Sequence, residues 1–82
     1  MSSVHTRDYK NLLKRLKQAR HEAGLTQVQV AARFKKPQSF IAKCESGERR
    51  IDFVELQAFS RLYGKSVAYF EATEGRNRRT RA

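Results

Sequence analysis

The chain has 82 residues, enough for one domain, and its 18 Lys and Arg against 8 Asp and Glu give a net charge of +10 at pH 7. That charge favours a polyanionic partner, nucleic acid above all, although a generally solvated basic surface has the same composition. A single cysteine excludes an internal disulfide and a cysteine-only zinc site, and the two histidines, His5 and His21, lack the spacing of a metal-binding pair. We therefore expect no metal and no cofactor.

The sequence carries no signal of membrane insertion or of catalysis. No apolar run approaches the roughly 20 residues that span a bilayer, and no hydrophobic signal segment follows Met1. It offers no plausible catalytic triad, metal cluster or glycine-rich phosphate loop. We expect a cytoplasmic protein that is not an enzyme and does not bind a membrane.

A first helix is predicted after a polar start. Residues 1–7 should form a flexible N-terminus. From Asp8 to Ala23 the apolar residues recur at steps of three and four, which indicates one stripe of a helix. The stripe consists of Tyr9, Leu12, Leu13, Leu16, Ala19 and Ala23. Gly24 follows and can take the positive φ that ends a helix.

A second, short helix begins at Thr26. Gln29 stands three residues later, which is the spacing of a capping box. Its inner face would consist of Val30, Ala31 and Phe34. Lys35 and Lys36 then form a tight turn.

The third helix begins near Pro37. Proline suits the first turn of a helix, where no amide hydrogen is required. This helix should run to about Ser46 and stop at Gly47. Two short helices joined by a tight turn are the arrangement that places one helix in the major groove of DNA.

Two further helices complete the predicted domain. Asp52 and Glu55 repeat the capping-box spacing and open a fourth helix that Gly64 closes. Its apolar residues on or near one face are Phe53, Leu56, Phe59 and Leu62. Ser66 can cap a last short helix that contains Val67, Ala68, Tyr69 and Phe70.

The composition changes at the C-terminal end. Residues 73–82 include four arginines and no core-forming residue, so we expect a disordered basic tail. The arginines at 76, 78, 79 and 81 would either contact DNA phosphates or a minor groove, or serve only as a solubilising tail. The prediction is therefore an all-α, compact domain of five helices over residues 8–72.

The third helix would present a polar face opposite its apolar one. Ile41 and Cys44 are three residues apart and should point inward, which at 100° per residue leaves the opposite side to small polar residues and one long cation. These are Ser39, Ala42, Lys43 and Ser46, with Gln38 at the helix start. A Gln amide matches adenine N6 and N7, a Lys can donate to guanine O6 and N7, and a Ser can bond to several bases. The alternative is a solvent-exposed face that is merely polar.

From about Leu12 to Phe70 the chain resembles the helix-turn-helix domain of the lambdoid phage repressors and Cro, the XRE-type regulators. The matching segments cover most of the chain in the same order, which is more specific than a lone motif. They are Leu25-Thr-Gln, Ala31, Ile41, Glu45-Ser-Gly-Glu-Arg-Arg, Asp52-Phe-Val-Glu-Leu and Tyr63-Gly-Lys-Ser-Val. The resemblance implies a lambda-repressor-like fold that binds double-stranded DNA.

The resemblance also implies roles for individual residues. The base-contacting positions are Gln38, Ser39 and Lys43, and the positions that contact the DNA backbone are Thr26, Gln27, Lys36, Ser46, Arg49 and Arg50. Gln27 would also brace the recognition helix. Arg20 and Glu45 match an ion pair that ties the first helix to the third, whereas a loose surface pair would be worth only roughly 0–1 kcal/mol.

Three residues are harder to interpret. Lys35 stands at the turn position usually held by glycine, so it should adopt left-handed geometry at a cost of roughly 1 kcal/mol, or else the turn has another shape. Cys44 replaces a branched aliphatic residue and is expected to act as a small hydrophobe rather than as a redox-sensing thiol. Phe40 either packs on the second helix or touches a sugar or a thymine methyl group, and we favour packing.

The last helix is the expected dimer surface. Val67, Tyr69 and Phe70 give it more apolar side chains than a short terminal helix buries unaided, and the resemblance implies twofold pairing through this end. The alternative is that these residues cap the core of the monomer.

Two functions fit these patterns. The first is a sequence-specific, homodimeric transcriptional regulator, a repressor that binds an inverted repeat with half-sites roughly 34 Å apart. The second is an antitoxin or accessory module that binds an unidentified partner protein and uses DNA binding only for autoregulation. RNA binding by the same basic face is a further alternative, although a helix in a groove suits B-form DNA better.

Overall fold

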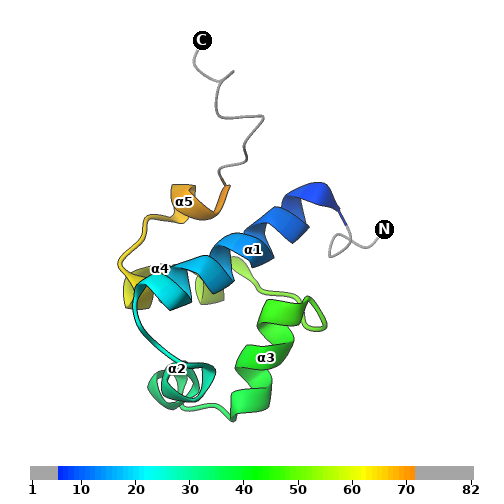
Figure 1. The fold of residues 1–82 in the computed structure, drawn as a ribbon. Coiled ribbons are helices and arrows are strands. Elements are labelled where there is room, and N and C mark those ends of the chain that lie inside the picture. Colours follow the sequence, from blue (N-terminus) through cyan, green and yellow to red (C-terminus); the bar gives the residue numbers. More distant parts are fainter. Residues whose placement is uncertain (1–5, 72–82) are drawn as a thin grey trace.

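The computed structural model describes residues 6–71, which form five helices and no strand (Figure 1). In chain order these are α1 (Arg7–Glu22), α2 (Gln27–Phe34), α3 (Gln38–Ser46), α4 (Phe53–Tyr63) and α5 (Val67–Glu71). The predicted all-α, five-helix fold is confirmed. No helix in the described part of the chain is long and apolar enough to cross a membrane. The predictions for residues 1–5 and for the basic tail lie outside the described residues.

Local capping sets the starts of α2 and α4 as the spacing predicted. The Thr26 hydroxyl accepts a hydrogen bond from the Gln29 N–H at 3.1 Å, and the Gln29 side chain accepts one from the Thr26 N–H at 2.8 Å. Asp52 and Glu55 form the same reciprocal pair, at 2.8 and 3.1 Å. Each pair satisfies two amide hydrogens that have no partner inside the helix.

Two helices start at slightly different residues than the sequence predicted. α1 begins at Arg7, one residue earlier, because the Thr6 side chain caps it by accepting a hydrogen bond from the Tyr9 N–H at 3.1 Å. Thr6 and Arg7 are therefore part of the folded domain rather than of a flexible N-terminus. α3 begins at Gln38, after Pro37, whose ψ of 157° is extended.

Gly47 ends α3 at a point where α1 passes close by. Its φ of 88° lies in the left-handed region that favours glycine, and a Cβ added there would meet Leu13 Cδ1 of α1 at 3.0 Å. A larger residue would therefore strain the backbone and push α1 away from the end of α3.

The core lies where the five helices meet. Its buried members are Leu16, Ala19, Val30, Ala31, Ile41, Cys44, Phe59, Tyr63 and Phe70. The Phe59 ring contacts Phe34 and Tyr63, with centroids 4.7 and 5.8 Å away. Cys44 has no exposed surface, and burial raises the pKa of its thiol, so its predicted role as a small hydrophobe is confirmed.

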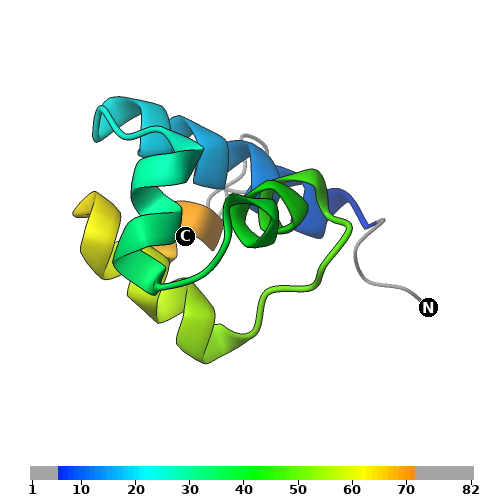
Figure 2. The same ribbon diagram turned by 90° about the horizontal axis from the view of Figure 1, so that it is seen from below.

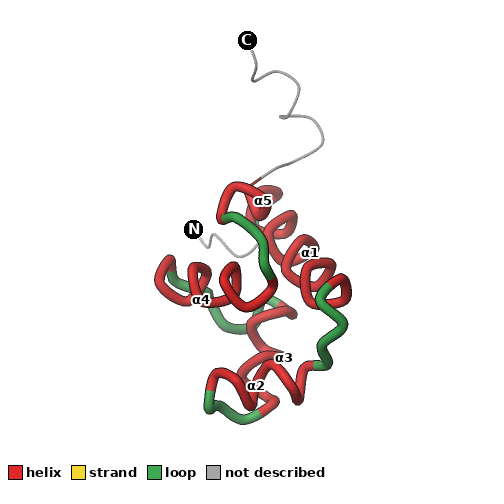
Figure 3. Tube along the Cα trace, turned by 90° about the vertical axis from the view of Figure 1, so that its left-hand side faces the viewer, coloured by secondary structure: helices red, strands yellow, loops and turns green. Residues whose placement is uncertain are grey.

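The helices divide the molecule into two ends. α2 and α3 lie together at one end, and α5 lies at the other, beside α1 (Figures 1 and 3). Seen from below, α2 and α3 lie in front of α1 and are packed against each other (Figure 2). The α2–α3 pair is thus exposed on the side that faces away from α1 and α5.

The structure corrects one prediction about apolar side chains and limits another. Phe70 is only 1% exposed, because α5 folds back onto α1 and delivers this ring to the core, so Phe70 cannot belong to a dimer surface. Phe53, predicted on or near the apolar face of α4, is 61% exposed, and its neighbour Val54 is 69% exposed. Both lie in the first turn of α4, before the helix enters the core at Phe59.

Candidate nucleic-acid interface

The turn between α2 and α3 has left-handed geometry at its first residue. Lys35 has φ 58° and ψ 44° and is the only non-glycine residue with positive φ among residues 6–71. The Lys36 N–H donates to the Ala31 carbonyl oxygen at 3.0 Å and closes the end of α2. The expectation that Lys35 adopts this conformation is confirmed. The turn packs α3 against α2, with Val30 and Ile41 fully buried.

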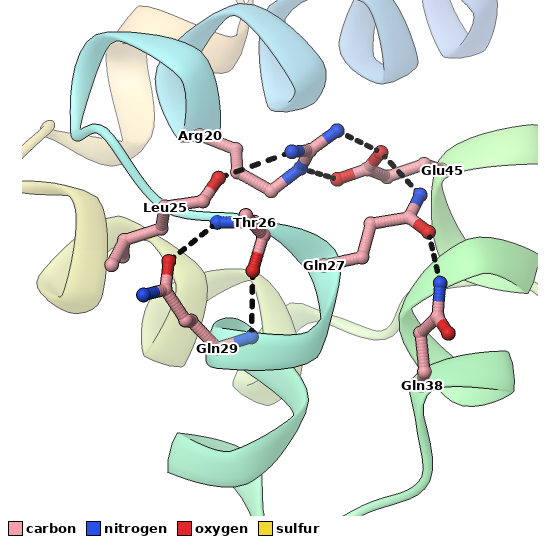
Figure 4. A network of polar contacts seen from close by, with 7 residues as sticks. All are labelled: Arg20, Leu25, Thr26, Gln27, Gln29, Gln38 and Glu45. Carbon is pink, nitrogen blue, oxygen red and sulfur yellow. Dashed lines mark hydrogen bonds and ion pairs between the residues drawn. The ribbon is translucent and has the colours of Figure 1, made fainter.

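A buried ion pair holds α3 to α1. The Arg20 guanidinium donates to both carboxylate oxygens of Glu45, at 2.7 and 3.0 Å, and to the Leu25 carbonyl oxygen at 3.1 Å (Figure 4). Only 11% and 3% of the two side chains are exposed. The hydrogen bonds with Glu45 raise the pKa of Arg20. Because two parallel bonds and a carbonyl satisfy the buried charge, the pair fixes the position of α3 relative to α1.

Gln27 extends this contact to the first residue of α3. Its amide nitrogen donates to Glu45 at 3.0 Å, and its amide oxygen accepts a hydrogen bond from the Gln38 side chain, also at 3.0 Å (Figure 4). Arg20, Glu45, Gln27 and Gln38 thus form a continuous polar chain from α1 through α3 and α2 to the exposed start of α3. We call this the Arg20–Gln38 chain.

The side chains predicted to contact bases lie on the exposed side of α3. Ser39, Lys43 and Ser46 are exposed at steps of four and three residues, and Gln38 is exposed at the helix start. Lys43 forms no ion pair within residues 6–71. The Ser46 hydroxyl accepts a hydrogen bond from the Glu48 N–H at 3.2 Å, which shapes the loop after α3. The exposed face is therefore polar and positively charged.

Arg49 and Arg50 are adjacent in the sequence but make different contacts. The Arg49 guanidinium donates to both carboxylate oxygens of Glu55, each at 2.8 Å, and lies 4.6 Å from the centroid of the Phe40 ring. The resemblance implied a contact of Arg49 with the DNA backbone, and the structure adds an intramolecular ion pair with Glu55. Arg50 is exposed, and its guanidinium lies 6.0 Å from the centroid of the Tyr9 ring.

Phe40 packs within the protein. Its ring is half-buried, 6.4 Å from the centroid of Phe34 on α2, and the Lys36 ammonium lies 5.3 Å from its centroid. With Arg49 on the same ring, these contacts support the interpretation of Phe40 as a packing residue.

The titratable side chains of residues 6–71 do not form a metal site. No group of three or more His, Cys, Asp or Glu side chains there is placed to hold a metal ion. Burial also raises the pKa of the Tyr63 hydroxyl. The exposed side chains at the α2–α3 end are mostly polar or basic, and Val28 of α2 is also 59% exposed.

Comparisons with known proteins agree with this geometry. A family model described as helix-turn-helix matches residues 16–70. A solved structure of an XRE-family like protein from Pseudomonas syringae pv. tomato str. DC3000 superposes with a TM-score of 0.74 at 41% sequence identity, covering 83% of this chain and 83% of that one. No curated protein matches the chain.

Proposed function

Because the chain belongs to the XRE family of helix-turn-helix proteins, a family of DNA-binding regulators, we propose that it is a sequence-specific DNA-binding regulator that places α3 in the major groove. One observation carries this proposal. The inner side of α3 is fixed to α1 and α2 by the Arg20–Gln38 chain, while its outer side exposes Gln38, Ser39 and Lys43. A rigid helix with a free polar face is what reading base edges requires.

Gln38 is the base-reading residue whose orientation is most restricted. Its amide nitrogen has two hydrogens, and only one of them is donated to Gln27. The second hydrogen and the amide oxygen remain for N7 and N6 of one adenine. The bond to Gln27 thus orients Gln38 without occupying the pair of groups that would recognise the base. Lys43 would contact a guanine about one and a half helical turns further along α3.

A ring of polar side chains would position α3 on the phosphate backbone. We assign this role to Thr26, Gln27, Lys36, Ser46 and Arg50. Phosphate contacts fix the register of the protein on the duplex but carry little sequence information. Arg49 is left out because its guanidinium is bound to Glu55.

We further propose that the regulator is a homodimeric repressor that binds an inverted repeat. Val67 and Tyr69 remain half-buried on α5 after Phe70 is assigned to the core. The exposed pair Phe53 and Val54 offers a second apolar patch. Two protomers related by a twofold axis would read half-sites about one helical turn, roughly 34 Å, apart.

The test begins with selection of binding sites from a pool of random duplexes. Fluorescence anisotropy then compares the selected duplex with a scrambled one at physiological salt. We expect a preference of at least about a thousandfold and an inverted repeat in the selected sequences. Gln38→Ala and Lys43→Ala should each relax preference at one position of the half-site, at a cost of about 1–3 kcal/mol. Equal affinity for both duplexes would refute sequence-specific binding, and a single asymmetric site would refute the twofold arrangement.

A further inference from the structure

A row of three lysines on α1 has no role in the recognition face described above. Lys10, Lys14 and Lys17 follow one another at steps of four and three residues, so they project from one side of the helix. All three are exposed, and none forms an ion pair within residues 6–71. Like charges at these spacings repel one another and destabilise a helix. The stability of α1 therefore does not explain the row.

The lysine row borders a cleft between α1 and the C-terminal end of α3. The cleft has a volume of about 570 Å³, and besides the three lysines its lining includes Leu13, Glu45 and Ser46. Glu45 does not compete for the lysines, because its two carboxylate oxygens already accept hydrogen bonds from Arg20 and Gln27. The cleft is therefore positively charged on the α1 side, with the Ser46 region at its other wall.

The cleft is continuous with the proposed DNA-binding face. Ser46 lies one turn after Lys43 on the exposed side of α3 and belongs to the residues assigned to the phosphate backbone. The C-terminal end of α3 lies directly beneath α1 (Figure 1), and Gly47 is so close to Leu13 that a Cβ would touch it. A phosphate strand that passes Ser46 would next meet α1.

We propose that Lys10, Lys14 and Lys17 form a second phosphate-binding surface, which contacts the DNA backbone beyond the base pairs that α3 reads. This inference rests on the proposed function and extends it. The contacts are to phosphates alone, so they raise affinity on every sequence and do not select bases. Each lysine that neutralises a phosphate releases a counterion and makes binding more salt-dependent.

The experiment uses the full chain and the variant Lys10→Gln/Lys14→Gln/Lys17→Gln. Anisotropy is measured over a series of salt concentrations with the selected duplex and the scrambled one. We expect the log–log salt slope of the variant to be shallower by up to about 0.9 per lysine, or about 2.7 in all. The ratio of affinities for the two duplexes should stay unchanged.

Duplex length provides a second, independent measurement. Lengthening the selected duplex by a few base pairs beyond each half-site should raise the affinity of the wild-type protein. The same extension should leave the affinity of the triple variant unchanged, because the additional phosphates no longer have partners. An equal gain for both proteins would overturn the proposal.

The matched control is Arg61→Gln on α4, which removes one exposed cation that does not line the cleft. It is compared with Lys14→Gln, which should lower the salt slope by up to about 0.9 while Arg61→Gln leaves it nearly unchanged. Lys14→Gln also serves as the test if circular dichroism shows that the triple variant does not fold. If the lysine variants kept the salt slope of the wild-type protein and the sequence preference were intact, only the proposal of a lysine surface would be overturned. Absence of any sequence preference in the wild-type protein would instead overturn the proposed function.

Discussion

Two arginine–glutamate pairs flank α3 and have almost the same geometry. Arg20 binds Glu45 at 2.7 and 3.0 Å at the α1 side, and Arg49 binds Glu55 at 2.8 and 2.8 Å at the α4 side. Their burial differs. The side chains of the first pair are 11% and 3% exposed, whereas those of the second are 38% and 23% exposed. The hydrogen-bond distances alone therefore do not show which pair contributes more to stability.

The stability lost when one member of an ion pair is removed depends on how deeply the pair is buried. Removing one member of a buried pair leaves an uncompensated charge out of contact with water, at about 3–5 kcal/mol, whereas exposed pairs are worth about 0–1 kcal/mol. The Arg20–Glu45 pair is thus a fixed part of the interface between α1 and α3. The Arg49–Glu55 pair can exchange its partners for water and serves mainly to hold the loop that carries Arg50.

The largest expected effect follows from breaking the buried pair. Glu45→Ala should lower the free energy of unfolding by about 3–5 kcal/mol, because Arg20 remains buried without its counterion. Urea denaturation measures this loss. The double variant Arg20→Met/Glu45→Leu should recover most of it, since neither charge is then buried. A loss below about 1 kcal/mol for Glu45→Ala would mean that the pair behaves like an exposed one.

The sequence predicted the contacts that form within one helical turn. The capping boxes at Thr26 and Asp52, and the left-handed Lys35, depend on the backbone of a few consecutive residues. Local spacing contains that information. The resemblance to a family then indicated the Arg20–Glu45 pair, although 25 positions separate the two residues.

Contacts that depend on how elements fold back were not predictable. Arg49 and Arg50 are equivalent in the sequence, and only the path of the loop after α3 brings Arg49 to Glu55. The burial of Phe70 depends on the packing of α5 against α1, and the exposure of Phe53 depends on where α4 enters the core, and no periodicity within α4 or α5 reveals either. The hydrogen bond between Gln27 and Gln38 likewise requires the crossing angle of α2 and α3.

A smaller effect is expected from cutting the polar chain between the buried pair and the recognition face. Gln27→Ala leaves both bonds of Arg20 to Glu45 in place, so the free energy of unfolding should fall by only about 1 kcal/mol. Affinity for the selected duplex should fall about tenfold, or about 1.4 kcal/mol, because Gln38 loses its orientation and the proposed phosphate contact of Gln27 is lost. Base preference at the position read by Gln38 should relax. Binding assays with single-base substitutions in the duplex measure this effect.

The control for this prediction is Gln29→Ala, in the same turn of α2. It removes one half of the capping box but no contact with Glu45 or Gln38. Its loss of stability should therefore be similar, with the base preference retained. If both variants relaxed the preference equally, the start of α2 as a whole, rather than the polar chain, would orient the recognition helix.

The smallest effect concerns the partly exposed Arg49–Glu55 pair and its pH dependence. The hydrogen bonds from Arg49 hold the pKa of Glu55 below its usual value near 4.5. A carboxylate with a lowered pKa stabilises the folded state above its unfolded pKa, and this contribution is lost as pH falls through the folded pKa. Glu55→Gln should therefore cost under about 1 kcal/mol at neutral pH, and wild type and variant should converge in stability as pH falls from about 4.5 through the folded pKa of Glu55. Glu48→Gln, which removes a carboxylate without an ion pair in the described residues, is the control and should differ little from wild type throughout. A difference between wild type and Glu55→Gln that stays constant as pH falls through this range would show that the contribution of Glu55 does not come from its charge.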